Sequence, residues 1–409
     1  MWRKSIGILG LLVLSAAPAK ADWYRGESPN FIVYSETTRA RLRDRILLLE
    51  AFDRLLRGLT ATTAPPSPNK LRVYLAHGIG ALQYVAPVGQ NVGGFYRASP
   101  DGAIAIADEY QNWRSNEDDT LLHEYTHHFM QQYHPAPYPT WYAEGFADYL
   151  MSANITPERI EYGNYNPIRA SWLVSRRGWI PYEQILFGNP RRLSAGRFYS
   201  QSWLLVHYIM ANEARRAAFV RYIQAVTRGD DARAAFTASF GMGATDVDRI
   251  LHEYARRITF HRITRSGTDP APPIRIERLE QAGLDTPLIE AALTIGVRAA
   301  NRRAVLNDAR RAGRGDDAFG KRLQARAEIL YGDVAVADRL LDELLAAAPT
   351  DAELLYLKGL RHLVAGRRDA AARRAEYRLA QGFFGRAHRA DPNHYPTLFR
   401  YAEALSEGD

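Results

Sequence analysis

Apolar residues recur at two different spacings in the first quarter of the chain. Short runs rich in β-branched and aromatic residues, bounded by turn-forming residues, predict strands. These runs lie at Asn30–Glu36, Leu71–Ala76, Val92–Arg97 and Ala103–Ala107, and the last two are spaced as a hairpin. Between the first two, Arg41–Leu59 has apolar residues at the spacing of one helix face. Residues 22–112 are therefore expected to form a mixed α/β subdomain.

The pattern changes after residue 112. Apolar positions at helical spacing dominate residues 113–265, which predicts a helical subdomain. Residues 266–277 are polar and rich in proline, and we expect a linker there. In residues 278–409, similar segments end at Gly332 and Gly366, 34 residues apart. That period is typical of tetratricopeptide-like repeats, with a plain helical bundle as the alternative.

These patterns together predict an α+β protein followed by an all-α helical-repeat domain. We expect the repeat domain to begin near Ile274 and to be separable from the rest of the chain by truncation near Pro272. The rival arrangement is a tail that packs on the first part of the chain as a lid or a brace. The sequence favours separation, because contacts between domains of one chain are usually modest.

The N-terminus is a different kind of segment. Arg3 and Lys4 precede an apolar run from Ile6 to Leu14, and Ala19-Lys20-Ala21 follows. This order predicts a secretory signal peptide over residues 1–21 and an exported, periplasmic or secreted protein. A membrane anchor is the alternative, but the apolar run is too short to span a bilayer. No later stretch has the length that a spanning helix needs, so we expect no integral membrane span.

Composition narrows the chemistry. The chain has 409 residues, no cysteine and a formal net charge of +8. Disulfides are excluded, and any metal site must use histidine and carboxylate ligands. The basic surplus is mild and is spread along the chain, whereas a nucleic-acid-binding protein concentrates it in a stripe. We expect no nucleic-acid partner.

The densest cluster of chemistry-bearing residues is the segment LLHEYTHHFM, at residues 121–130. On a helix, His123 and His127 lie on one face, one turn apart, and can bind one cation. Glu124 points about 100° away from His123 and can reach a water beside the metal. H-E-x-x-H therefore predicts two zinc ligands and a general base. We expect His128 to be a packed or surface histidine.

A third ligand separates a metal site from a helix that merely carries histidines. Glu144 lies 17 residues after His127, within TWYAEGFADYL, which is predicted to be the next helix. A short turn could bring it back beside the first two ligands. Asp148 follows four residues later on the same face. Metal-bound histidines usually donate their second N–H to a carboxylate, and we expect Asp148 to accept it.

The pair HEYTH and WYAEGFADY resembles the gluzincin clan of zinc metallopeptidases, and most closely its secreted bacterial peptidase-MA-like branch. The resemblance covers roughly residues 28–260 and implies a zincin-like catalytic domain. It implies Zn²⁺ bound by His123, His127 and Glu144, with Glu124 as base and Asp148 supporting a ligand. Gluzincins also use a tyrosine or histidine from a later helix to stabilise the oxyanion. Tyr199 is the first choice for that role and His207 the second.

The leading function is therefore a zinc metallopeptidase acting on a peptide or protein substrate. A protein partner could bind the C-terminal repeats, because stacked helix pairs form extended concave surfaces. Two alternatives stay open at this point. One is an inactive scaffold whose repeats do the binding. The other is a zinc hydrolase of a non-protein amide in the cell envelope.

Overall fold

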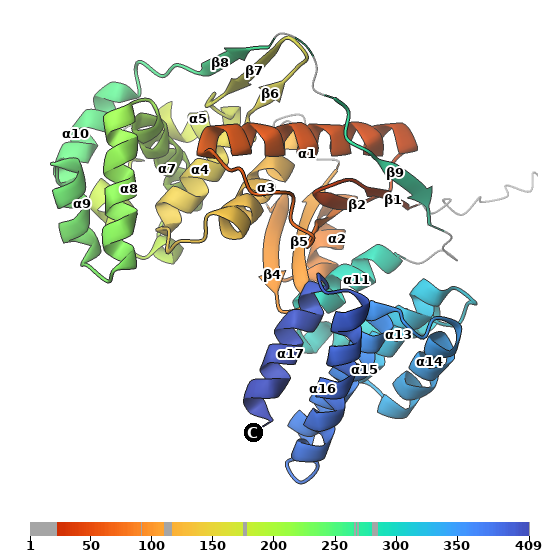
Figure 1. The fold of residues 1–409 in the computed structure, drawn as a ribbon. Helices are drawn as coiled ribbons and strands as arrows, with labels where there is room; N and C mark the ends of the chain where they lie inside the picture. Colours follow the sequence, from red (N-terminus) through yellow and green to blue (C-terminus); the bar gives the residue numbers. More distant parts are fainter. Residues whose placement is uncertain are drawn as a thin grey trace, which may run out of the picture.

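A computed structural model describes residues 23–90, 92–109, 117–174, 178–265, 267, 270–279 and 285–408 (Figure 1). The expected signal peptide at residues 1–21 lies outside the described residues. The described part is a mixed α+β protein with a helical C-terminal region, as the sequence predicts. No helix among these described residues has the length and apolar content that crossing a bilayer requires.

A six-stranded mixed sheet forms the centre of the molecule, in the order β4-β5-β3-β2-β1-β9. The neighbouring strands β5, β3 and β2 run parallel, and the remaining pairs are antiparallel. Their bounds are β1 Tyr24–Glu27, β2 Phe31–Ser35, β3 Leu71–Ala76, β4 Gly94–Ser99, β5 Gly102–Asp108 and β9 Arg275–Arg278. The four strands expected from the sequence are confirmed within about two residues at each end. Strands β1 and β9 were not expected from the sequence.

Side chains alternate between the two faces of the sheet, and each face has its own helical cover. Val33 and Val73 point toward helix α1 (Arg39–Thr60), which buries Ile46 and Leu49 against them. On the opposite face, a second set of buried strand residues packs against α2 (Gly78–Val85) and α11 (Thr286–Ile295). These strand residues are Tyr34, Tyr74, Ile104 and Ile106.

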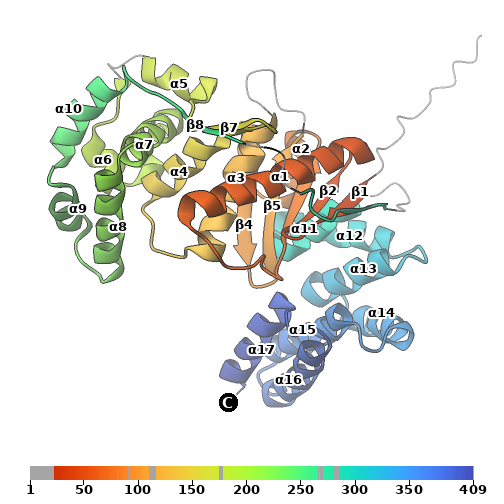
Figure 2. The same cartoon turned by 45° about the horizontal axis from the view of Figure 1, so that its top comes forward.

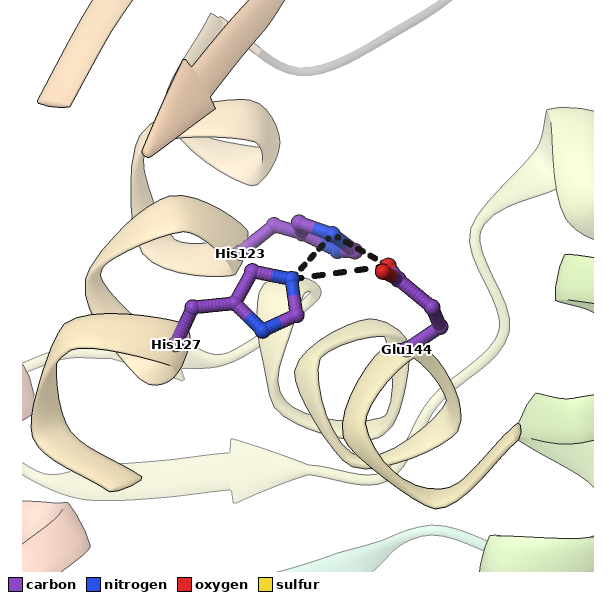
Figure 3. A group of neighbouring side chains, drawn as sticks. All are labelled: His123, His127 and Glu144. Carbon is purple, nitrogen blue, oxygen red and sulfur yellow. Dashed lines mark hydrogen bonds and ion pairs between the residues drawn. The ribbon is translucent and has the colours of Figure 1, made fainter. Parts of the chain in front are cut away.

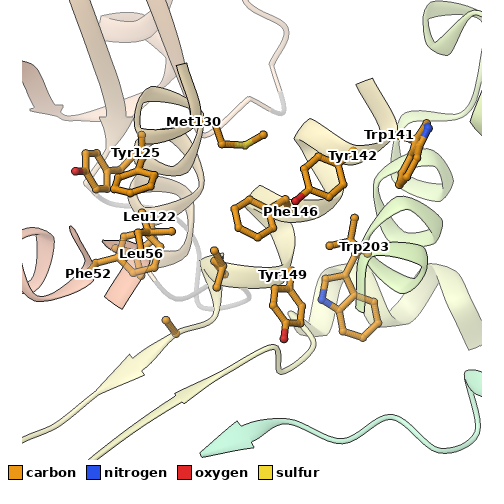
Figure 4. Packing of buried hydrophobic residues seen from close by; sticks show 14 of the residues in the cluster. Phe52, Leu56, Leu122, Tyr125, Met130, Trp141, Tyr142, Phe146, Tyr149 and Trp203 are labelled. Atoms are coloured by element: carbon orange, nitrogen blue, oxygen red, sulfur yellow. The ribbon is translucent and has the colours of Figure 1, made fainter. Parts of the chain in front are cut away.

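The second half of the core is helical and lies at the β4 end of the sheet (Figures 1 and 2). Its helices are α3 Glu117–Tyr133, α4 Thr140–Met151, α5 Pro167–Val174, α6 Tyr182–Phe187, α7 Ala195–Met210, α8 Glu213–Thr227, α9 Ala232–Phe240 and α10 Ala244–Tyr254. A small sheet joins β6 (Asn154–Ile155), β7 (Arg159–Tyr162) and β8 (His261–Thr264). Aromatic side chains from α3, α4 and α7 fill the space between these helices (Figure 4).

The segment expected to be a linker contributes to the core instead. Strand β9 pairs antiparallel with β1 along all four of its residues. Helix α11 then buries Leu288 and Ala291 on the sheet, and Tyr74 donates a hydrogen bond to Glu290 at 3.1 Å. The expected boundary near Pro272 is therefore corrected, because truncation there would remove a strand and the cover of one sheet face. The sequence could not show this, since both contacts join residues about 200 or more positions apart.

The C-terminal region continues as consecutive helices after α11. They are α12 Arg302–Ala312, α13 Ala318–Tyr331, α14 Val334–Ala347, α15 Ala352–Arg368, α16 Arg373–Ala390 and α17 Tyr395–Glu407. Helices α13 to α17 each contribute buried side chains to one apolar cluster, which is separate from the core around the sheet. The expected all-α tail is thus present, and it is attached to the first part of the chain through α11.

A second attachment lies at the turn between β4 and β5. Asp101 in this turn is 7% exposed and accepts a hydrogen bond of 2.7 Å from the Tyr356 hydroxyl of α15. Nε of Arg400 lies 3.0 Å from Asp101 Oδ1, and Nη2 of Arg326 lies 3.3 Å from Oδ2. Burial favours the neutral acid, but the two guanidinium groups outweigh it and lower the pKa of Asp101. The tail therefore holds the tip of the β4–β5 hairpin through a buried charge cluster.

The packing of α11 leads to a stability prediction. Leu288→Ala should lower the free energy of unfolding by about 2–5 kcal/mol, because it opens a cavity under the sheet. Leu398→Ala removes the same atoms from a residue that is 44% exposed, and it should change stability by less than about 0.5 kcal/mol. Urea unfolding of the full chain measures both. Equal, small effects would mean that α11 is a detachable part of the tail.

Candidate metal centre

Two consecutive helices supply the ligand atoms. Helix α3 ends at Tyr133, directly before the His134-Pro135 step, and α4 starts seven residues later at Thr140. Since α3 is regular through the motif, the side chains of His123 and His127 project from the same face one turn apart. Helix α4 lies beside this face and directs Glu144 toward both imidazoles (Figure 3).

The three ligand atoms form a nearly equilateral triangle. Nε2 of His123 and Nε2 of His127 are 3.2 Å apart. Oε2 of Glu144 lies 3.3 Å from the first nitrogen and 3.4 Å from the second. Ligands held about 2.0–2.1 Å from a tetrahedral zinc ion are separated from one another by about 3.3–3.4 Å. The donor set and its spacing therefore fit one zinc ion, and this is the only such group found among the described residues.

Asp148 supports the first ligand from behind. Its Oδ1 lies 2.9 Å from Nδ1 of His123, and the carboxylate is fully buried. A carboxylate beside Nδ1 favours the ring orientation in which Nε2 faces the ligand triangle. The other side of the carboxylate meets Arg169, whose Nε lies 2.6 Å from Oδ2. The sequence predicted Asp148 at this position but gave no sign of Arg169 of α5.

The electrostatics of the ligand set favour a cation. Burial acts to lower the pKa of His123, but Asp148 and Glu144 outweigh it and raise this pKa to about 10. For Glu144, burial acts in the opposite direction, and the two histidines hold the pKa of the carboxyl well below its usual range. A metal that takes the Nε2 lone pair of His123 would displace a proton from this group. The acidic partners that attract that proton would equally stabilise a metal ion.

Glu124 lies in the same cleft but outside the ligand triangle. It is 9% exposed, and burial raises the pKa of its carboxyl, while the neighbouring histidines and the backbone of Tyr96 act against the rise. Tyr96 belongs to β4, the edge strand of the main sheet. The base expected from the sequence is thus a buried carboxyl between the ligand helix and a strand edge.

The cleft above these groups has a volume of about 500 Å³, within the range of ligand sites. Gly93 and Gly94, His123 and Glu124, and Tyr199 line it from three directions. Gly94 is needed for the approach of β4 to α3. A Cβ there would lie 2.6 Å from Cγ2 of Thr120 and 2.7 Å from the carbonyl oxygen of Ile106.

Of the two expected oxyanion donors, the structure brings only Tyr199 to the site. Its ring centroid lies 6.3 Å from that of His123, and burial raises the pKa of its phenol, so the hydroxyl stays protonated. The expectation that His207 could be the oxyanion donor is corrected. This histidine lies two turns further along α7, with Nδ1 2.8 Å from the Tyr254 hydroxyl and Nε2 2.6 Å from the Thr259 carbonyl. Both ring nitrogens are occupied, so His207 is a buried structural residue.

The remaining histidine of the motif is packed, as expected. His128 is 6% exposed, and its Nδ1 lies 3.3 Å from the Tyr96 hydroxyl. Burial lowers its pKa to about 4, which keeps it neutral. It stands next to a ligand in sequence and takes no part in the ligand triangle.

Comparison with known proteins adds no family assignment. No protein-family model matches the chain, and a search of curated proteins found no match. The interpretation of the site therefore depends on the motif and on the geometry of its side chains.

The adjacent histidines provide a matched test of metal binding. The mature protein should bind one zinc ion per chain, and His127→Ala should reduce the content at equal free zinc to below about a tenth of an equivalent, because only two ligands remain. His128→Ala should keep a full equivalent. Atomic emission analysis after dialysis against buffered zinc measures both. Loss of zinc in His128→Ala with retention in His127→Ala would contradict the ligand assignment.

Proposed function

We propose that the protein is an exported zinc metallopeptidase of the gluzincin type. The observation that carries the proposal is the ligand triangle of 3.2–3.4 Å, whose member His123 lines one cleft together with a separate buried carboxyl, Glu124. A structural zinc site has no need of a further carboxyl beside its ligands, and usually has four protein ligands. Three ligands leave a position free for water or substrate.

The metal ligands and Glu124 have different roles in the proposed hydrolysis. Zinc held by the three ligands would act as a Lewis acid, lowering the pKa of a water and polarising the scissile carbonyl. Glu124 accepts a proton from the attacking water and then delivers it to the leaving amine. Burial raises the pKa of the Glu124 carboxyl, and this direction favours a group that must first accept a proton and then donate it.

Tyr199 stabilises the negative charge that develops on the carbonyl oxygen. It lines the cleft, and its phenol is protonated, so it can donate a hydrogen bond to the oxyanion. Among the described residues, none forms a hydrogen bond with this hydroxyl, which leaves it available to substrate. The geometry thereby supports the first of the two donors expected from the sequence.

The edge of the sheet favours an extended peptide as substrate. Among the described strands, β4 pairs with β5 alone, and Gly93 and Gly94 at its start line the cleft. An extended chain can pair with such an edge through main-chain hydrogen bonds, independently of its side chains. We propose a peptide or protein substrate on this basis. The C-terminal helices would then offer a second surface for a protein partner, and we propose no role for nucleic acid.

Exchange of Glu124 for its amide separates metal binding from hydrolysis. Glu124→Gln should keep a full equivalent of zinc and the wild-type melting temperature but lose about 10²–10⁴-fold in kcat, because an amide cannot accept the proton. Glu50→Gln is the control, a buried carboxyl that accepts two hydrogen bonds from Asn30 outside the cleft. Cleavage of a quenched peptide library by the zinc-loaded proteins is the measurement.

Three results would count against the proposal. Undiminished cleavage by Glu124→Gln would exclude this residue as the base. A zinc-loaded wild type that cleaves no peptide but hydrolyses cell-envelope amides would move the protein to that class of hydrolase. A zinc-loaded wild type inactive on both would favour the scaffold role.

A further inference from the structure

Among the described residues that line the cleft, Arg169 is the charged side chain to which neither the motif nor the mechanism gives a role. It lies on α5, lines the cleft, and is 23% exposed at its side chain. Its Nε lies 2.6 Å from Oδ2 of Asp148 and its Nη2 lies 3.3 Å from Oδ1, which is a bidentate pair. The planar guanidinium therefore fixes the orientation of the carboxylate that supports His123.

Asp148 needs this partner. Its carboxylate is fully buried, and a buried carboxylate that loses a charged partner is strongly disfavoured. His123 Nδ1 meets one oxygen of Asp148 at 2.9 Å, and Arg169 Nε meets the other. The Asp148 carboxylate therefore positions both His123 and Arg169.

The guanidinium also contacts the expected oxyanion donor. Cζ of Arg169 lies 4.6 Å from the ring centroid of Tyr199, within the distance of a cation–π contact. The ring of Tyr199 in turn lies 6.3 Å from that of His123. Arg169 therefore contacts both Asp148, which lies against the His123 ring, and Tyr199, whose ring also lies near His123.

Arg169 is itself held by a buried cap. The side-chain oxygen of Asn166 accepts the backbone N–H of Ile168 at 2.9 Å and that of Arg169 at 3.3 Å. Its amide nitrogen donates to Asp119 of α3 at 2.7 Å. The start of α5 is therefore tied to the helix that carries His123, which keeps the guanidinium in register with the ligands.

We infer that Arg169 is a positioning residue that holds the orientation of a metal ligand, through Asp148, and that of the oxyanion donor Tyr199 in one arrangement. The inference rests on the proposed function for the Tyr199 half and on the metal site alone for the Asp148 half. Lysine could neutralise Asp148, but it lacks the planar fork that pairs bidentately and stacks at the same time. The two halves can therefore be separated by substitution.

The first arm of the experiment measures zinc affinity by competition with a chromogenic chelator. Arg169→Met should weaken zinc binding by about 10–100-fold, because Asp148 loses its anchor and His123 its fixed ring orientation. In an Asp148→Asn background the same substitution should change the affinity by less than about threefold, since Arg169 acts through that carboxylate. Tighter zinc binding in Arg169→Met would overturn the inference, because the guanidinium would then act only as a repelling charge.

The second arm measures peptide hydrolysis at saturating zinc. Arg169→Lys should lower kcat by about 10–100-fold with KM within about twofold, and it should lower kcat by less than about threefold in a Tyr199→Phe background. A rise in KM with unchanged kcat would mean that Arg169 binds substrate directly, and additive losses would mean that it does not act through Tyr199. Either result overturns this half.

A matched stack provides the control. Cζ of Arg215 lies 3.7 Å from the ring centroid of Tyr208, which is on the same helix as Tyr199 but away from the cleft. Arg215→Lys should leave zinc affinity, kcat and KM within about twofold of the wild type, and thermal melts check that every variant is folded. If the zinc-loaded wild type hydrolyses no peptide, the proposed function fails, and the zinc arm still decides whether Arg169 positions His123.

Discussion

The close approach of α4 to α7 at Gly145 is the contact on which the metal centre depends. A Cβ at this position would lie 2.5 Å from the carbonyl oxygen of Ser202, so only glycine lets the two backbones meet. The preceding residue, Glu144, then faces α3 and its two histidines, while α7 brings Tyr199 to the same cleft. One packing contact thereby sets the position of the third ligand and of the expected oxyanion donor. The packing of α4 against α7 therefore explains why a glycine, Gly145, follows Glu144 in the motif.

Placing ionisable groups inside a packed core is costly unless each has a partner. Around His123 the partners form a chain, in which Asp148 faces the ring and Arg169 faces Asp148. The ligand nitrogens and the Glu144 oxygen face one another at 3.2–3.4 Å. A divalent cation at that point would satisfy all three, which is the physical basis of the proposed zinc chemistry.

How far the sequence could predict this site depends on the sequence separation of each contact. Helical periodicity was enough to place His123 and His127 on one face and to turn His128 away. Glu144 and Asp148 followed from the next helix and from the resemblance to gluzincins. Arg169 could not be predicted, because a guanidinium can pair with any carboxylate that the fold brings near it. His207 was wrong for a related reason, since its partners Tyr254 and Thr259 are about 50 residues away.

The same limit explains the error in the domain boundary. A proline-rich polar stretch is typical of a linker, and its composition gave no sign that Arg275–Arg278 pairs with β1. The apolar face of α11 was visible in the sequence, but the surface that it covers is made by strands at the opposite end of the chain. Strands with internal alternation and local turns were predicted correctly, whereas β1 and the edge strand β9, which pair with each other across about 250 residues, were not.

Zinc-edge X-ray absorption of the zinc-loaded protein tests the central claim most directly. We expect one zinc ion bound by two imidazole nitrogens and one carboxylate oxygen, at about 2.0–2.2 Å, with a further light ligand from solvent. In Glu144→Gln the fitted protein oxygen ligand should be lost while both imidazole contributions remain. A spectrum with a single imidazole or none, or one that Glu144→Gln leaves unchanged, would contradict the assignment of this ligand set.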